Sequence, residues 1–452
     1  TSHPPIFDCE FRAYHRRMTF TAIRSALLHC LRDPGLAGDA SAIEYLPDAI
    51  TVMRDGRVHA VGAADALLPT LGADVRMDDQ RGRMLAPGFV DTHVHYPQVD
   101  VIASYGTQLL DWLNRYTFPA ELAFAERAHA DVAANFFLDR VLENGTTTAA
   151  VFCTVHPQSV DAFFTASEAR GLGMIAGKCL MDRHAPEGLT DTADTGYRDS
   201  KALIERWHGH ARSRYAITPR FAPTSTLPQM QAMGQLAREH PDVYIQSHVA
   251  ENRAEIAWVN ELFPGHRSYL DVYDHYGLLR DRAIYAHCIH LDDADRARMT
   301  AAGATPSFCP TSNLFIGSGL YNLQQALAAG NAVSVGTDIG GGTSYSMLRT
   351  LGEAYKVQQL LGTSLSPAYA LYLATLGGAR ALSLDDEIGS IMPGKFADFA
   401  LLDPAATPLL ARRTTLRDDP LDTFFALMTL GDDRAIAATY ASGRCVHRRA
   451  MP

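Results

Sequence analysis

The chain has 452 residues, of which 47% are hydrophobic and 20% charged, and its formal net charge is -10. This composition is typical of a globular protein with a substantial core, and no apolar stretch approaches the roughly 20 residues of a membrane helix. A negative chain without basic patches is a poor partner for a nucleic-acid polymer. We therefore expect a soluble protein that acts on a small molecule and binds neither membrane nor nucleic acid.

The first 17 residues contain Arg12, Arg16 and Arg17 but no apolar core of signal-peptide length. We interpret residues 1–17 as an extension or expression remnant outside the fold, with Met18 as a candidate native start. The seven cysteines are scattered and never form a C-x-x-C pair, a pattern that favours reduced thiols in a cytoplasmic protein.

Residues 18–84 contain short strand-like pieces, including a predicted hairpin at 50–62 whose turn lies at 54–57. The same style returns in residues 388–452, where 394–402 and 435–446 are strand candidates. We predict that these two end segments together build one small β-sandwich domain.

Residues 85–387 alternate short apolar or β-branched runs with longer helical patterns such as 123–144 and 227–240. This alternation predicts an α/β fold, a (β/α)8 TIM-like barrel with a parallel sheet. The eight expected strands cover residues 85–95, 146–156, 174–182, 215–224, 244–251, 284–291, 305–312 and 332–338.

Potential metal ligands stand at the ends of four of these strands. His93 and His95 lie two residues apart and therefore share one face of a strand. His248, His287 and Asp338 each follow an apolar run. A lone histidine in such a place is more often a hydrogen-bonded core residue, and a lone aspartate can cap a turn. Their joint occurrence at the carboxyl ends of barrel strands favours a metal site, since that end carries the reactive residues of this fold.

The motifs PGFVDTHVH (87–95), SHVAE (247–251), AH (286–287) and GTD (336–338) occur in this order. Together they resemble the amidohydrolase superfamily, in particular its deaminase branch. Three further segments, DWLNRYTFPAE (111–121), TPRF (218–221) and TDIGGGTSYSM (337–347), resemble the guanine deaminase family. The resemblance runs from about residue 18 to beyond residue 398.

This resemblance implies one Zn2+ per chain, with iron as the alternative metal, held by His93, His95, His248 and Asp338. Such a nitrogen and oxygen donor set suits zinc, which lowers the pKa of water toward neutrality. Beside the metal, His287 would orient the water and Asp338 would hold the hydroxide. Glu251 would be the proton shuttle, as the nonligating glutamate is in zinc base deaminases.

The resemblance also implies guanine as substrate and xanthine and ammonia as products, in purine catabolism or salvage, by a homodimer. Gln98 and Arg220 would read O6 and the ring nitrogens, because their amide and guanidinium groups present directional donors. Phe221 would pack on the base, and Trp112 would form a wall or lid. From the residues alone, Arg220 could equally be a surface ion pair and Phe221 a core contact.

Two other interpretations stay open. A related aminohydrolase that acts on another aminopurine or an amino-triazine, such as 8-oxoguanine or ammeline, would need the same metal site. A barrel without catalytic activity could serve as a binding scaffold, although this chain keeps every candidate ligand.

Two-metal members of the superfamily bridge their ions with a carboxylated lysine. Lys178 falls in the third expected strand, whereas the bridging lysine belongs to the fourth, where this chain has the segment around Arg220. We therefore expect a single metal ion.

Overall fold

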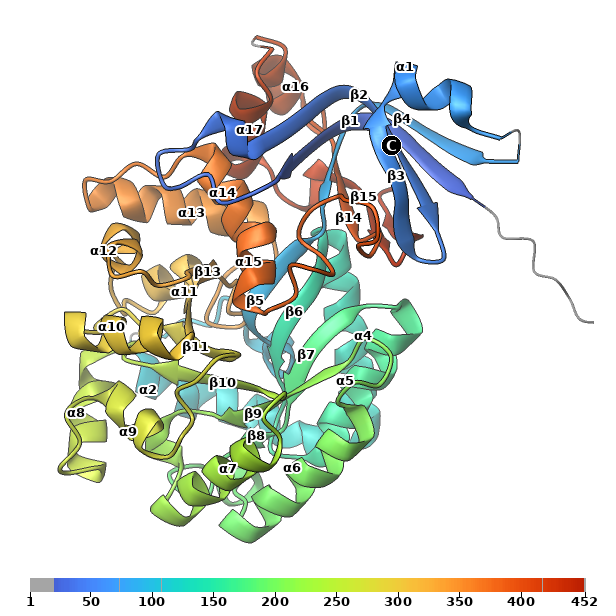
Figure 1. Ribbon diagram of the computed structural model, residues 1–452. Helices are drawn as coiled ribbons and strands as arrows, with labels where there is room; N and C mark the ends of the chain where they lie inside the picture. The colour runs from blue at the N-terminus through green and yellow to red at the C-terminus, as the bar shows by residue number, and fades with distance from the viewer. Residues whose placement is uncertain (1–19, 73, 107, 417, 451–452) are drawn as a thin grey trace, which may run out of the picture.

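The computed structural model describes residues 20–450 except residues 73, 107 and 417. Figure 1 shows a barrel ringed by helices and, beside it, a second sheet in which blue strands from the start of the chain meet red strands from its end. The interpretation of residues 1–17 falls outside the described residues. Within the described part, no helix has the length and apolarity needed to cross a membrane.

The barrel sheet is parallel throughout, in the order β13-β12-β11-β10-β9-β7-β6-β5, with β8 paired to β9. Each of the eight predicted ranges contains a strand, and the predicted α/β barrel is confirmed. The strands are β5 (Phe89–His95), β6 (Thr146–Phe152), β7 (Gly173–Gly177), β8 (Cys179–Leu180), β9 (Arg214–Pro219), β10 (Tyr244–Val249), β11 (Ala283–His287), β12 (Thr305–Phe308) and β13 (Ser334–Val335).

Several strands end earlier than their predicted ranges. Residues 153–156 leave the ladder after β6, and β13 has only two residues where seven were expected. The chain turns at these points: Asp338, beyond β13, has φ 52°, and His287, at the end of β11, has φ 70°. A left-handed backbone cannot continue a strand, so β11 ends at His287 and no strand can run through Asp338.

The first and last strands of the barrel are joined at their carboxyl ends. The His95 amide donates to the Ile339 carbonyl at 2.8 Å, and the Asp338 amide donates to the His93 carbonyl at 2.9 Å. The Asp91 carboxylate accepts from the amides of His93 (3.2 Å) and Thr337 (3.0 Å). These bonds fix the His93–His95 segment against the Asp338 segment.

The two helical ranges expected from the sequence are present. Residues 123–144 form a short 3-10 turn followed by α4, and residues 227–240 contain α7, which begins where the Thr226 side chain accepts from the Gln229 amide. The helices are α1 (Ala64–Leu67), α2 (Leu109–Trp112), α3 (Phe118–Leu122), α4 (Arg127–Glu143), α5 (Pro157–Arg170), α6 (Ala193–Trp207), α7 (Leu227–Glu239), α8 (Arg253–Leu262), α9 (Tyr269–His275), α10 (Asp293–Ala302), α11 (Pro310–Phe315), α12 (Leu323–Ala328), α13 (Met347–Leu360), α14 (Pro367–Ala374), α15 (Leu376–Ala381), α16 (Pro408–Thr414) and α17 (Pro420–Leu430).

The end segments form a separate β domain, as predicted. Its strands make one seven-stranded sheet in the order β16-β15-β14-β4-β1-β2-β3, in which only the β1–β4 pair is parallel. Bulges in β1 shift its register against both neighbours. The seven strands pair along one continuous path, so the domain is a single sheet and not the two layers of the predicted sandwich. The strands are β1 (Thr21–Cys30), β2 (Ile43–Arg54), β3 (Arg57–Ala63), β4 (Arg76–Pro87), β14 (Phe399–Leu402), β15 (Ile436–Ala441) and β16 (Arg444–Arg448).

Two details of this domain differ from the expectation. Only residues 399–402 of the predicted strand 394–402 are extended, because the Lys395 ammonium donates to the Ile388 carbonyl at 3.2 Å and to Ser390 Oγ at 2.7 Å, which keeps the preceding residues in a loop. The C-terminal segment also contributes α17, which contacts α13 and α14 of the barrel. The hairpin at 50–62 is confirmed, and Asp55 and Gly56 at its turn have φ 52° and 80°.

Candidate metal centre and active site

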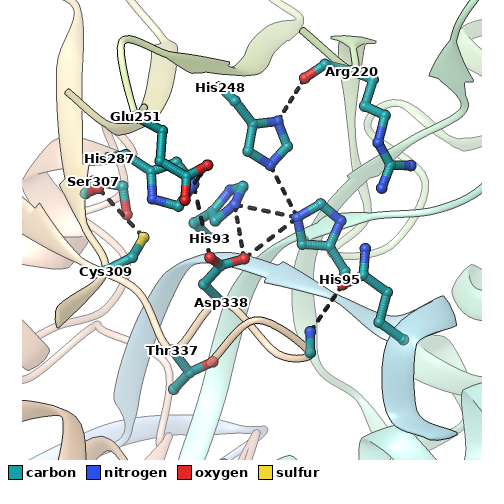
Figure 2. Close-up of polar contacts among 12 residues, drawn as sticks. His93, His95, Arg220, His248, Glu251, His287, Ser307, Cys309, Thr337 and Asp338 are labelled. Atoms are coloured by element: carbon teal, nitrogen blue, oxygen red, sulfur yellow. Dashed lines mark hydrogen bonds and ion pairs between the residues drawn. The ribbon is translucent and has the colours of Figure 1, made fainter. Parts of the chain in front are cut away.

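Three imidazoles and one carboxylate converge at the carboxyl end of the barrel (Figure 2). His95 Nε2 lies 3.2 Å from His93 Nε2 and 3.1 Å from His248 Nε2. Asp338 Oδ1 lies 3.2 Å from His93 Nε2 and 3.5 Å from His95 Nε2. Two of these residues lie on β5, His248 lies on β10, and Asp338 follows β13, so strands far apart in the sequence deliver the four groups to one point.

The charge state of these groups fits a cation. Burial lowers the pKa of His93 and lowers those of His95 and His248 well below the ordinary value, which favours the neutral, metal-binding form of each imidazole. His248 Nδ1 donates to the Arg220 carbonyl at 2.5 Å, which leaves the Nε2 lone pair directed at the cluster. Neutral nitrogen lone pairs and a carboxylate at such short separations repel one another unless a cation lies between them, and their chemistry suits zinc.

Asp338 carries the negative charge of the cluster. Burial alone would raise its pKa, but the surrounding imidazoles, His93 first among them, outweigh that effect and lower it. The second oxygen, Oδ2, faces His287 Nε2 at 3.7 Å. Asp338 therefore has one oxygen toward the candidate ligands and the other toward the space above them.

Glu251 lies beside this cluster, in the loop between β10 and α8. Its Oε2 lies 3.3 Å from His287 Nε2, and its Oε1 accepts from Ser318 Oγ at 2.7 Å. Burial raises the pKa of Glu251, whereas Glu251 and Asp338 together raise that of His287 despite its burial. A carboxyl group whose protonated form is made more accessible is suited to exchanging protons.

The side chains predicted to recognise substrate line a recess over the cluster. Gln98, Trp112, Arg220 and Phe221 contribute to its wall, together with His95, His248, Glu251, His287 and Asp338. Arg220 is 2% exposed, so its ion pair is not a surface one. Phe221 is 4% exposed and packs in a hydrophobic cluster as well as lining the recess. The structure thus brings all of the predicted site residues to one buried location, with His93 directly beneath the recess.

Several residues of this site were not assigned from the sequence. Glu121 pairs with Arg220, Ser318 holds Glu251, and Asn313 Oδ1 lies 2.9 Å from His287 Nδ1. Glu255 lines the recess and accepts from the Glu251 amide at 3.0 Å. Cys309 follows the end of β12, and its sulfur lies near ligand atoms of His93 and Asp338. Of these residues, only Cys309 follows an apolar strand directly, which is the pattern that identified the candidate ligands.

Lys178 does not face the metal cluster. Its buried ammonium forms an ion pair with Asp191, and its backbone amide donates to the Tyr215 hydroxyl at 3.3 Å. The Lys178 ammonium is therefore engaged by Asp191.

The chain matches the amidohydrolase family model over residues 84–446. It is also 49% identical to the guanine deaminase of Escherichia coli (strain K12) over 410 residues, which is 91% of this chain and 93% of that protein. The chain belongs to the guanine deaminases of the amidohydrolase family. The predicted family resemblance is thereby confirmed.

Solved structures of guanine deaminases share this fold. The E. coli guanine deaminase structure is 48% identical, with a TM-score of 0.94 over 95% of this chain and 100% of that one. A guanine deaminase from C. acetobutylicum with guanine bound in its active site is 28% identical, with a TM-score of 0.85 over 95% of this chain and 100% of that one. Both the barrel and the second sheet are therefore features of guanine deaminases.

Proposed function

We propose that this protein hydrolyses guanine to xanthine and ammonia. One observation carries the proposal: a single buried recess is lined by three of the four candidate metal ligands and Glu251, and also by Gln98 and Arg220. The first group suits hydrolysis of a carbon–nitrogen bond, and the second suits recognition of a polar heterocycle. The likeness to a guanine deaminase with bound guanine supports guanine as the base that fits between them.

His93, His95, His248 and Asp338 would hold one Zn2+ per chain. A bound zinc ion supplies water activation, since it lowers the pKa of water from about 15.7 to about 7. Iron is the alternative metal. Lys178 is paired with Asp191, which supports a single ion and not a bridged pair.

Glu251 would move the protons of the reaction. Its carboxylate accepts a proton from the attacking water and delivers it to N3 of guanine as the water oxygen bonds to C2. The same carboxylate then carries the second proton from the oxygen on C2 to the exocyclic amino group. The carbon–nitrogen bond breaks, the oxygen becomes the C2 carbonyl of xanthine, and ammonia leaves. His287 Nε2, 3.3 Å from Glu251 and 3.7 Å from Asp338, would orient the water and stabilise negative charge as it attacks.

The opposite edge of the base would face donors. Arg220 presents guanidinium hydrogens and Gln98 an amide hydrogen, which match the acceptors O6 and the ring nitrogens of a keto purine. Phe221 would pack on the ring, and Trp112 would close the wall. Adenine places an amino group where guanine has O6, so this edge would leave buried donors facing donors and reject adenine.

The decisive experiment combines metal analysis with product detection. Purified protein is expected to carry one zinc per chain and to convert guanine to equal amounts of xanthine and ammonia. Ammonia release is followed in parallel with 8-oxoguanine, adenine, cytosine and ammeline. Turnover of one of these with none of guanine would replace the proposed substrate, and absence of both bound metal and hydrolysis would support a scaffold instead.

We further propose that the enzyme is a cytoplasmic homodimer. The six cysteines in the described residues are all unpaired, which supports a reducing compartment. The dimer rests on the family resemblance alone, and light scattering of the purified protein tests it.

A further inference from the structure

A buried ion pair involves Arg220, one of the side chains that line the recess. Arg220 Nη1 donates to both oxygens of Glu121, at 2.9 and 2.7 Å. The two side chains are 3% and 1% exposed. Glu121 comes from α3, which the chain reaches through a π-helical turn after α2, whereas Arg220 follows β9. The pair therefore joins a segment after the first barrel strand to the end of a strand in the middle of the barrel.

Glu121 also fixes the orientation of Gln98. Gln98 Oε1 accepts from the Gly340 amide at 3.0 Å, and Gln98 Nε2 donates to Glu121 Oε1 at 3.2 Å. Because the Gly340 amide can only donate, the oxygen of the Gln98 amide is assigned without ambiguity. Glu121 thus holds both predicted base-reading side chains, and each of them keeps further N–H donors for a ligand.

The charge of the pair matters as much as its geometry. A guanidinium stays positively charged at any ordinary pH, and in a buried site an unpaired one would attract anions strongly. Among the described residues, Glu121 is the acidic side chain in contact with this guanidinium. With Glu121 in place, Arg220 and Gln98 offer hydrogen-bond donors to a ligand, while the carboxylate of Glu121 balances the positive charge of Arg220.

We propose that Glu121 is a positioning residue that makes the recess prefer a neutral keto purine over an anionic one. This inference rests on the proposed function, in which guanine is neutral and the product xanthine is the more acidic base. Because Glu121 neutralises its charge, Arg220 donates a hydrogen bond to the O6 of guanine but does not attract ionised xanthine more strongly than neutral xanthine. Glu121 therefore limits retention of the product as well as aligning the substrate.

The test measures equilibrium binding of xanthine and of hypoxanthine to the metal-loaded enzyme, below and above the pKa of xanthine. Hypoxanthine keeps the keto edge but lacks the amino group that leaves. In the wild type, xanthine affinity should not rise when the ligand ionises. In Glu121→Gln, the affinity for ionised xanthine relative to neutral hypoxanthine should rise at least roughly tenfold, while kcat/KM for guanine falls.

Three further variants complete the design. Glu121→Asp retains the charge and should keep the wild-type ratio of xanthine to hypoxanthine affinity. Glu121→Gln combined with Arg220→Gln removes both charges and should abolish the gain, a double-mutant comparison that isolates the pair. Glu126→Gln alters an exposed glutamate close by in the chain and should behave as wild type. Other protein groups that titrate between the two pH values are the same in all variants. The result is therefore the difference between variants in the ratio of xanthine to hypoxanthine affinity.

An unchanged ratio in Glu121→Gln would overturn the inference, as would an equal loss of affinity for both ligands, which a purely structural role predicts. If Glu121→Gln fails to load metal, the double variant and Glu121→Asp still test whether Glu121 sets the preference between the two ligands. A double variant that strongly prefers ionised xanthine contradicts the proposal. The ratio does not depend on turnover. Failure of the wild type to deaminate guanine would refute the proposed function separately.

Discussion

The two sides of the recess are built differently. The metal side takes each of its residues from the end of a barrel strand or the loop directly after it, so the sheet itself sets their positions. Arg220 and Gln98 on the base side also follow barrel strands, but both are bonded to Glu121, a residue of a short helix outside the sheet. The barrel thus places the reacting groups, whereas the groups that contact the base also depend on a buried charge network. The difference predicts that variants on the metal side change kcat, while variants on the base side change selectivity.

Glu251→Gln tests the metal side most severely. The amide cannot accept and return protons, so kcat is expected to fall by about 10²–10⁴-fold while zinc content stays at one per chain. Turnover of guanine and metal analysis on the same sample check this. The matched control is Glu261→Gln, an exposed glutamate on α8, which should leave both unchanged. Substantial activity in Glu251→Gln with its zinc retained would refute the shuttle role.

Arg220→Lys tests the base side. A lysine keeps the charge but cannot span both oxygens of Glu121 while offering further fixed donors to a base. We expect kcat/KM for guanine to fall by about 10²-fold, with metal content unchanged and discrimination against adenine weakened. Arg198→Lys, an exposed arginine on α6, provides the control. Loss of zinc from Arg220→Lys would show that the two sides are not separable.

Ser318→Ala gives a smaller effect on the metal side. The Ser318 hydroxyl donates to Glu251 at 2.7 Å, so its removal frees the carboxylate to rotate and loses one bond that favours the ionised form. A fall of about tenfold in kcat is expected, together with an upward shift of the limb of the pH profile that reports Glu251. Ser318→Thr retains the hydroxyl and should restore the profile. A lower rate with an unshifted profile would contradict positioning of Glu251.

Glu255→Gln tests the stability of the loop that carries Glu251. Burial, reinforced by the charge of Glu251, raises the pKa of Glu255 from 4.5 to about 7. The folded state therefore holds this proton more tightly than the unfolded state, and the free energy of unfolding should fall as pH rises from 4.5 to 7, by at most about 1.4 kcal/mol per pH unit. Denaturant titrations of wild type and variant across this range should differ by that slope. Parallel curves would contradict a protonated Glu255.

The barrel and its metal side could be predicted from sequence because both are local patterns. An apolar run followed by a histidine or aspartate reports a strand and the residue at its end in one short segment. His93, His95, His248 and Asp338 were found in this way, and the structure places them within hydrogen-bonding distances of one another. The predicted strands extend beyond the observed ones, because some of the residues at which the chain leaves the sheet are themselves apolar or β-branched.

The network around Arg220 could not be derived in this way. Glu121 lies inside a recognised motif, but its role depends on a contact across 99 positions of sequence. Ser318 and Glu255 likewise act through the residues they hold, and neither spacing nor periodicity reports which carboxylate a serine will reach. The single sheet of the β domain was missed for a similar reason: strand content is local, whereas the pairing of β1 with both β2 and β4 is not.

The hydrogen bonds that join β5 to the segment after β13 have a consequence for how the enzyme is made. His93 is synthesised early and Asp338 late, and Asp338 reaches His93 only when its amide donates to the His93 carbonyl. A ribosome-bound chain that has not yet released the last barrel strand cannot assemble the ligand set. The complete set of four candidate ligands therefore forms only after the last barrel strand has joined the sheet.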